Sequence, residues 1–153
     1  MFNYFPNNYM WSSTVIMGLM AGAQLGEMHR WLEPLRDKEG DMEAWDKAWV
    51  GMAAKQEELA LADLKAGRRM SAGARYSRAA IYRLLGERQM EVGANKLERY
   101  KSALASFDAA VQYAPLPVER IEVASPDGPL PGYLIPAGPR PQRRSSSSIL
   151  DST

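Results

Sequence analysis

The chain contains no cysteine and only one histidine, His29, among its 153 residues. The missing thiols exclude disulfides, thiolate zinc sites, iron–sulfur clusters and cysteine nucleophiles. A single imidazole cannot form the paired histidine ligands that hold a metal on one helix face. A lone histidine between Glu27 and Trp31 is typical of a packed or solvated helix position. We therefore expect no metal site and no cofactor.

An excess of charge of one sign is also missing. Nineteen Lys and Arg residues face eighteen Asp and Glu residues, which leaves a net charge of +1 and argues against a dedicated nucleic-acid binder. The apolar stretch at residues 15–25 is shorter than the roughly 20 residues that a membrane span needs. No basic residue precedes it, as a secretory signal would require, since the first is Arg30. The sequence predicts a cytoplasmic protein with neither a nucleic-acid nor a membrane partner.

Catalytic motifs are missing as well. The chain has no G-x-S-x-G serine elbow, no phosphate-binding loop and no dinucleotide fingerprint. In catalytic triads whose members follow the chain order Ser, Asp, His, the histidine comes last. In this sequence His29 lies near the start. We assign no catalytic residue, and the sequence leaves open whether the chain acts as an enzyme.

What the chain does contain is a long helix-compatible region over residues 11–115, after an irregular lead-in at residues 1–10. Residues 12–32 form the first helical stretch. Asp41 is a plausible N-cap of a long helix that ends near Gly67, where a glycine favours a C-terminal cap. Two further helices follow, and the last carries apolar residues at helical spacing, Leu97, Tyr100, Leu104, Phe107 and Val111. The pattern predicts a mainly α fold, a bundle of about four helices.

The pattern changes after Pro117. Residues 118–123 alternate like a half-buried strand, and Ser125-Pro126-Asp127-Gly128 is a strong turn signal before a second strand. We expect a β-hairpin over residues 116–136, followed by a disordered basic and serine-rich tail over residues 137–153. Because an isolated hairpin is marginal in water, it suggests a larger sheet that this sequence does not contain.

Two groups of side chains are candidates for binding. The first is aromatic and could line a substrate pocket, although aromatic residues at helical spacing more often form a core; it comprises Trp45, Trp49, Tyr76 and Tyr82. The second is a basic stretch suited to phosphate or nucleic acid, but we favour pairing with Glu57, Glu58, Glu87 and Glu91; it comprises Arg68, Arg69, Arg75, Arg78 and Arg83.

Several segments resemble the N-terminal part of an α/β-hydrolase family that includes 2,6-dihydroxypseudooxynicotine hydrolase and fungal polyketide-shortening pigment hydrolases. The matching segments span roughly residues 20–138 and read GAQLGEMHRWL, GDMEAWDKAWVGMA, AGRRMSAGARYSRAAIYRLLGE, KLERYKSALASFDAA and PVERIEVASPDGPLPGYLIPAG. The resemblance implies that the helices form a cap beside a catalytic domain and that the hairpin opens the α/β-hydrolase sheet. The nucleophile, acid and histidine of such enzymes have no counterpart in this sequence.

Our main hypothesis is an N-terminal fragment of such a hydrolase, interrupted near Ala137 and inactive alone. Its parent would act on ester or C–C bonds of a small-molecule carbonyl substrate, and the cap aromatics would select that substrate. A cap without its catalytic domain would expose its docking face and could form homo-oligomers. The alternative is a stand-alone tetratricopeptide-like interaction module, suggested by small residues at Ala79, Ala80, Ala103 and Ala110. A small ligand-binding bundle is a third hypothesis.

Overall fold

The computed structural model describes residues 3–113 and 118–136. Contacts divide the chain into a helical unit, Met1–Pro115, and a second unit, Leu116–Thr153. The helical unit contains α1 (Tyr9–Met20), α2 (Leu25–Leu32), a 3-10 helix (Glu33–Lys38), α3 (Met42–Lys65), α4 (Arg69–Glu87) and α5 (Ala94–Gln112). The second unit contains the strands β1 (Glu119–Val123) and β2 (Leu130–Leu134). The mainly helical fold with one hairpin is confirmed. The tail expected over residues 137–153 lies outside the described residues.

The first helical stretch differs from the prediction. Residues 12–32 form two helices, because the chain turns at Gly22, whose φ of 97° is readily adopted only by glycine. The described part therefore has five α-helices instead of about four. The helix α1 begins at Tyr9, within the expected lead-in, and Phe5 of that segment is fully buried.

The ends of α3 are capped as the sequence predicts. The Asp41 carboxylate accepts a hydrogen bond from the Ala44 N–H at 3.0 Å, which satisfies one of the free donors at the helix start. At the other end, Gly67 takes a φ of 74°, and the Arg68 N–H returns to the Asp63 carbonyl at 2.8 Å. This glycine-ended cap closes α3 and leads directly into α4.

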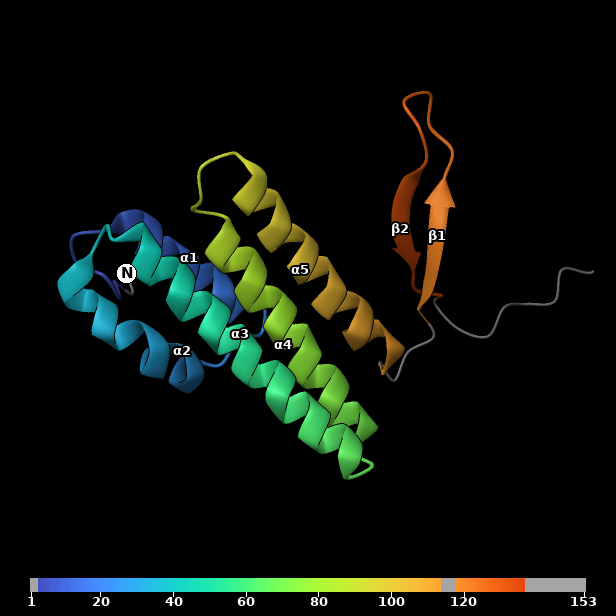
Figure 1. Cartoon of the computed structure of the whole chain (residues 1–153), viewed down its shortest axis with the longest axis horizontal. Helices are drawn as coiled ribbons and strands as arrows, with labels where there is room; N and C mark the ends of the chain where they lie inside the picture. Colours follow the sequence, from blue (N-terminus) through green and yellow to red (C-terminus); the bar gives the residue numbers. More distant parts are fainter. Residues whose placement is uncertain (1–2, 114–117, 137–153) are drawn as a thin grey trace, which may run out of the picture. The chain divides into compact units, whose positions relative to one another are not determined.

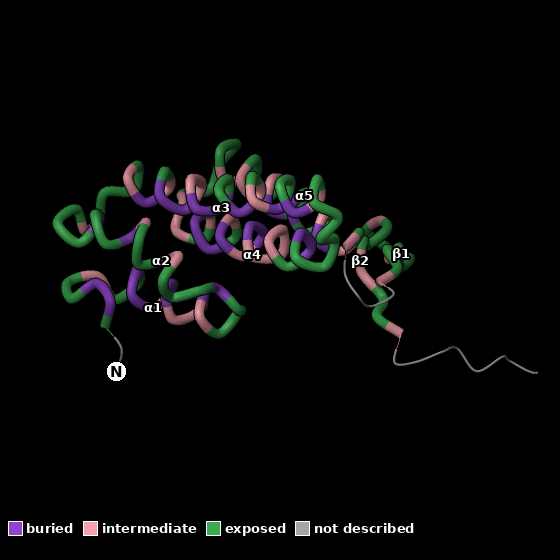
Figure 2. The backbone as a smooth tube through the Cα atoms, turned by 90° about the horizontal axis from the view of Figure 1, so that it is seen from below, coloured by how far each residue is buried: buried purple, intermediate pink, exposed green. Residues whose placement is uncertain are grey.

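The helices form two layers. The helices α3, α4 and α5 lie side by side with α4 in the middle, and consecutive helices run in opposite directions (Figure 1). Figure 2 shows α1 and α2 as a second layer against α3 and α4. The buried backbone positions lie mainly where these two layers meet and along α4. Among the described residues, no helix is both long and apolar enough to cross a membrane.

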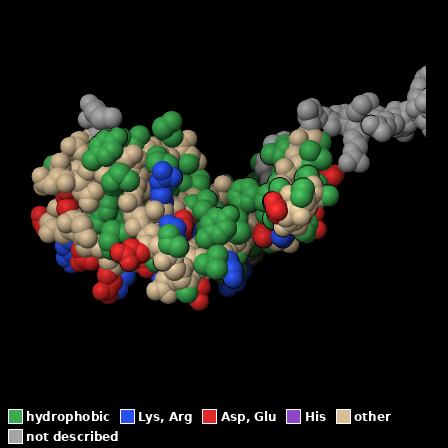
Figure 3. Space-filling view, turned by 90° about the horizontal axis from the view of Figure 1, so that it is seen from above, with side chains coloured by type: hydrophobic (Ala, Val, Ile, Leu, Met, Phe, Trp, Pro, Cys, Tyr) green, Lys and Arg blue, Asp and Glu red, His purple; other side chains and the backbone are tan. Residues whose placement is uncertain are grey.

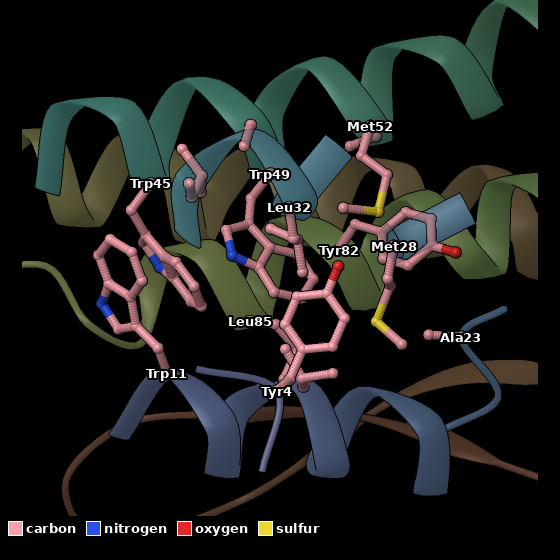
Figure 4. Close-up of a cluster of buried hydrophobic side chains, with 14 of the residues drawn as sticks. Tyr4, Trp11, Ala23, Met28, Leu32, Trp45, Trp49, Met52, Tyr82 and Leu85 are labelled. Carbon is pink, nitrogen blue, oxygen red and sulfur yellow. The ribbon is translucent and has the colours of Figure 1, made fainter. Parts of the chain in front are cut away.

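The core between the layers is a continuous series of aromatic rings (Figure 4). Phe5 meets Trp11 edge to face at 5.1 Å, and Trp11 stacks on Trp45 with ring centroids 4.4 Å apart. Trp45 then contacts Trp49 at 5.3 Å, and Trp49 contacts Tyr82 at 6.1 Å. Offset and edge-to-face rings contribute stabilisation beyond the area that they bury. This series joins α1, α3 and α4.

Glycines allow α3 to approach its neighbours closely. A Cβ atom at Gly86 of α4 would lie 2.6 Å from the Cβ of Trp49, and one at Gly51 would lie 2.5 Å from the Trp31 ring. Neither distance is compatible with an ordinary side-chain contact. The two glycines therefore set the helix spacing on this side of the bundle.

The hairpin pairs its strands antiparallel, with Glu119 opposite Leu134 and Val123 opposite Leu130. The turn is the predicted one: Gly128 adopts a φ of 113° and its N–H donates to the Ser125 carbonyl at 3.0 Å. No residue of the described hairpin is buried. A two-stranded ribbon of this kind has no core of its own.

Candidate functional site

Three of the four predicted pocket aromatics lie together in the core. Trp45, Trp49 and Tyr82 are fully buried and contact one another in sequence, so their rings pack on protein. Tyr76 lies apart from them, is half-buried, and stacks on Tyr113 with centroids 6.1 Å apart. The structure thus brings together three members of the predicted group and separates the fourth. A role in substrate contact stays a prediction for all four.

The indole N–H groups of Trp45 and Trp49 are buried and have no hydrogen-bond acceptor among the described residues. The Trp49 ring is tilted by 60° to the Trp45 ring, and its nitrogen lies on the side nearer Trp45 in Figure 4. An N–H directed at an aromatic face is a weak but real interaction. The Trp49 N–H therefore lies beside the Trp45 ring within the packed core.

A polar cluster joins α2, α3 and α4 at the edge of the core. The Tyr82 hydroxyl donates to a carboxylate oxygen of Glu27, and Arg78 lies 3.5 Å from the same oxygen. Arg78 also donates to the amide oxygen of the buried Gln56 at 3.2 Å. Burial and then the hydrogen bond to Glu27 raise the pKa of Tyr82 far above its ordinary value. The phenol therefore stays protonated, which suits a structural link and not a catalytic base.

The predicted basic stretch is committed to contacts within the fold. The hydrogen bonds from Arg75 and Arg68 hold the pKa of the Asp63 carboxyl below its ordinary value. The predicted pairing with Glu57 is confirmed for Arg83, whereas Glu58 pairs with Lys55 and Glu87 with Lys96. The five arginines share four partners: Asp63 for Arg68 and Arg75, the Tyr113 ring for Arg69, Glu27 for Arg78 and Glu57 for Arg83.

His29, the sole histidine, lies on the exposed side of α2. Its Nδ1 is 2.8 Å from the Tyr4 hydroxyl. Over residues 3–113 and 118–136, no three His, Cys, Asp or Glu side chains converge as metal ligands would. The hydrogen bond to Tyr4 gives this imidazole a role in holding the N-terminal segment against α2.

The clearest feature of the helical unit that points outward is on α5. Three large apolar side chains follow one another at spacings of three and four residues, and each exposes 40–52% of its surface. We call this set the α5 stripe; it comprises Leu97, Tyr100 and Leu104. The space-filling view shows hydrophobic side chains gathered on the surface of the molecule (Figure 3). The spacing of these residues is visible in the sequence, but the side of α5 that is buried is not.

An open hollow of about 250 Å³ lies where α4 turns into α5, at the first residues of the α5 stripe. The Lys96 ammonium pairs with the Glu87 carboxylate at 3.0 Å and also donates to the carbonyls of Glu87 and Met90. Its charge is therefore satisfied within the fold, and the surface left to a ligand is mostly apolar. The lining residues are Glu87, Val92, Gly93, Lys96, Leu97 and Tyr100.

Comparison with known proteins relates the chain to a hydrolase. No family model matches it. It is similar to a protein of Pyricularia oryzae named Hydrolase ORFZ, with 30% identity over 133 residues. The match covers 74% of this chain but 31% of that protein, so the chain spans about a third of the relative's length.

Proposed function

We propose that this chain is the helical cap part of an α/β-hydrolase and that another region of the enzyme supplies the catalytic residues. The observation that carries the proposal is the similarity to a hydrolase over 74% of the chain and 31% of the relative. The missing serine elbow and the position of the single histidine agree with a non-catalytic part. The hairpin supports it further, since none of its described residues is buried, as expected of strands that await a sheet.

In this role the chain shapes the substrate site without performing the bond cleavage. A cap excludes water from a reacting carbonyl centre, which strengthens the electrostatic interactions there. The buried rings of Trp45, Trp49 and Tyr82 would act indirectly, by keeping α3 and α4 rigid. Tyr76 is the only one of the predicted aromatics that keeps exposed surface, and we propose it as the one that contacts substrate. The substrate class is a small carbonyl compound, cleaved at an ester or C–C bond.

The test is a chimera in which this chain replaces the matching segment of the Pyricularia oryzae hydrolase. Hydrolysis of a series of aryl esters with acyl chains of different length is compared between the chimera and the parent. We expect hydrolysis by the chimera with a changed chain-length preference, and a further change in Tyr76→Ala but not in the control Tyr9→Ala on α1. A folded chimera without any hydrolysis would contradict the proposal.

A stand-alone interaction module is the second candidate, and the packing of α4 on α5 favours it. The small residues proposed for such a module are all buried, as in helical hairpins that pack closely; they are Ala79, Ala80, Ala103 and Ala110. This role requires the isolated chain to select peptides by itself. A peptide-library screen with the purified chain separates the two: specific binding favours the module, and no binding together with an active chimera favours the cap.

A further inference from the structure

We infer that the α5 stripe and the adjoining hollow are the surface onto which the catalytic region of the hydrolase docks, with one apolar side chain of that region filling the hollow. The inference rests on the proposed function and adds to it the surface and the chemistry of the contact.

The orientation of α5 is fixed by polar contacts on its other sides. Arg99 makes two hydrogen bonds to the Asp46 carboxylate, at 2.8 and 3.0 Å, and Ser106 donates to Glu57 at 2.7 Å. Bidentate contacts of this kind depend strongly on geometry. Rotating α5 to bury Leu104 would break them. These polar contacts therefore fix the rotation of α5 and keep the α5 stripe on its outer side.

The buried side of α5 is already complete without the stripe. Its fully packed positions are small, Ala103, Ser106 and Ala110, which let α5 lie close against α4. Leu97, by contrast, exposes 52% of its surface and Leu104 exposes 40%. A row of exposed large apolar side chains at alternating spacings of three and four is the seam through which a helix packs on a partner.

The hollow has the properties of an anchor site. It is open, measures about 250 Å³, and contains an internally paired Lys96 and Glu87 among its otherwise mainly apolar walls. Protein interfaces concentrate their binding energy where a large side chain fills a pocket and excludes water from it. An aliphatic or aromatic side chain fits this chemistry, whereas a charged group would find no free partner in the Lys96–Glu87 pair.

The occupant follows from the length of the relative. This chain matches 31% of the Pyricularia oryzae hydrolase, so most of that protein lies outside the match and is available to cover an apolar face. The outer face of α1 offers less, because its most exposed apolar residues, Tyr9, Met10 and Met20, lie at the two ends of the helix. The α5 stripe is continuous over two turns.

The absence of cysteine from the chain makes a direct test possible. Leu104→Cys on the stripe and Met10→Cys on α1 are each introduced into the isolated chain and into the chimera with the Pyricularia oryzae hydrolase. Labelling by a maleimide is followed by mass spectrometry, which locates the modified residue. Met10 is a matched control because it is 53% exposed.

Both thiols should label rapidly in the isolated chain. In the chimera we expect Leu104→Cys to label at least about tenfold more slowly, the factor that about 1.4 kcal/mol of docking free energy provides, while Met10→Cys is unchanged. Adding Gly93→Trp, which fills the hollow from an extended position with free space around it, should restore rapid labelling of Leu104→Cys.

The outcomes separate the two proposals. An active chimera in which Leu104→Cys labels as fast as in the isolated chain overturns the docking surface and leaves the cap function standing. Protection of Met10→Cys alone assigns the docking to α1 and overturns the inference in the same way. A folded chimera that hydrolyses nothing contradicts the proposed function itself, whatever the labelling shows.

Discussion

The two sides of α4 contact their neighbours through different types of residue. Towards α1 and α3 the contact is aromatic, with Trp49 and Tyr82 fully buried and Gly86 allowing close approach. Towards α5 the contact is made by small residues, Ala103 and Ala110 among them, and by the Lys96–Glu87 ion pair. The first side uses its large apolar residues to hold the bundle together. The second side holds α5 with small and charged residues and leaves the large apolar ones exposed.

This difference identifies the exposed apolar side of α5 as the part of the surface that the packing of the helices does not explain. Exposed apolar residues scattered singly are normal on any protein, but a contiguous row marks an interaction surface. If the comparison is right, substitutions on the aromatic side change stability, whereas substitutions on the stripe change association. Four experiments test this comparison, beginning with the largest expected effect.

Trp49→Ala should produce the largest loss of stability. The ring is fully buried between two aromatic neighbours, and such truncations cost about 3–5 kcal/mol through lost burial and the cavity left behind. Leu97→Ala, at an exposed site, should stay within about 0.5 kcal/mol of the wild type. Urea unfolding followed by circular dichroism measures both, and equal losses would remove the distinction between the two sides.

Gly86→Ala should destabilise the chain by about 1–3 kcal/mol, because the new methyl group overlaps the Trp49 Cβ atom near the backbone. Gly26→Ala is the matched control, since it lies in α2 with nothing within 4 Å of the added atom. There we expect stabilisation by about 0.5–1 kcal/mol, the usual gain of alanine over glycine in a helix. Thermal melts of the two variants should therefore shift in opposite directions; shifts of the same sign would contradict the close approach.

Glu57→Gln tests the polar contacts that join α3 to both α4 and α5. Burial alone would raise the pKa of Glu57, but the hydrogen bonds from Arg83 and Ser106 outweigh it and lower the pKa below the ordinary 4.5. A lowered pKa in the folded state adds stability above pH 4.5 that is lost as the pH falls through the folded value. We expect a loss of about 1–2 kcal/mol at neutral pH and a flatter decline of stability in acid.

The control for that experiment is Glu58→Gln, one residue along α3. Glu58 is 68% exposed and pairs only with Lys55 on the same helix, so its removal should cost less than about 0.5 kcal/mol. Acid titrations of both variants, followed by circular dichroism, give the comparison. Identical pH profiles for Glu57→Gln and wild type would show that the contacts of Glu57 with Arg83 of α4 and Ser106 of α5 do not contribute.

The smallest effect on stability is expected for Leu97→Glu combined with Leu104→Glu. Both side chains are exposed, so unfolding should change by no more than about 0.5 kcal/mol. Binding of a hydrophobic dye, and any self-association seen by size-exclusion chromatography, should fall. Met10→Glu with Met20→Glu controls for general surface apolarity, and an equal fall there would argue against a special role for the stripe.

Much of the fold was predictable because its signals are local. The Asp41 cap, the glycine end at Gly67 and the turn at Gly128 depend on a few neighbouring residues, and each adopts the expected conformation. The break at Gly22 was missed, since an isolated glycine in a helical pattern is compatible with both a continuous helix and a turn. The three-and-four spacing on α5 was also visible, but it marks an apolar side without saying whether that side is covered.

The candidate sites were less predictable because they depend on contacts between distant segments. Nothing in the spacing of Trp45, Trp49, Tyr76 and Tyr82 separates the three that pack together from the one that stacks on Tyr113. The pairing of Arg83 with Glu57 was expected, but the use of Asp63 by two arginines was not. An arginine pairs with whichever acidic side chain folding brings near, so its partner cannot be derived from the order of residues in the sequence.

Composition, capping and motif order are properties of the chain, so the helical class, the hairpin and the lack of a G-x-S-x-G motif can be read from the sequence. Which face of each helix is buried depends on the tertiary structure. The close approach of α3 and α4 encloses the tryptophans, whereas the fixed rotation of α5 leaves Leu97 and Leu104 exposed. Burial depends on what packs against a residue, and that is settled only when distant parts of the chain meet.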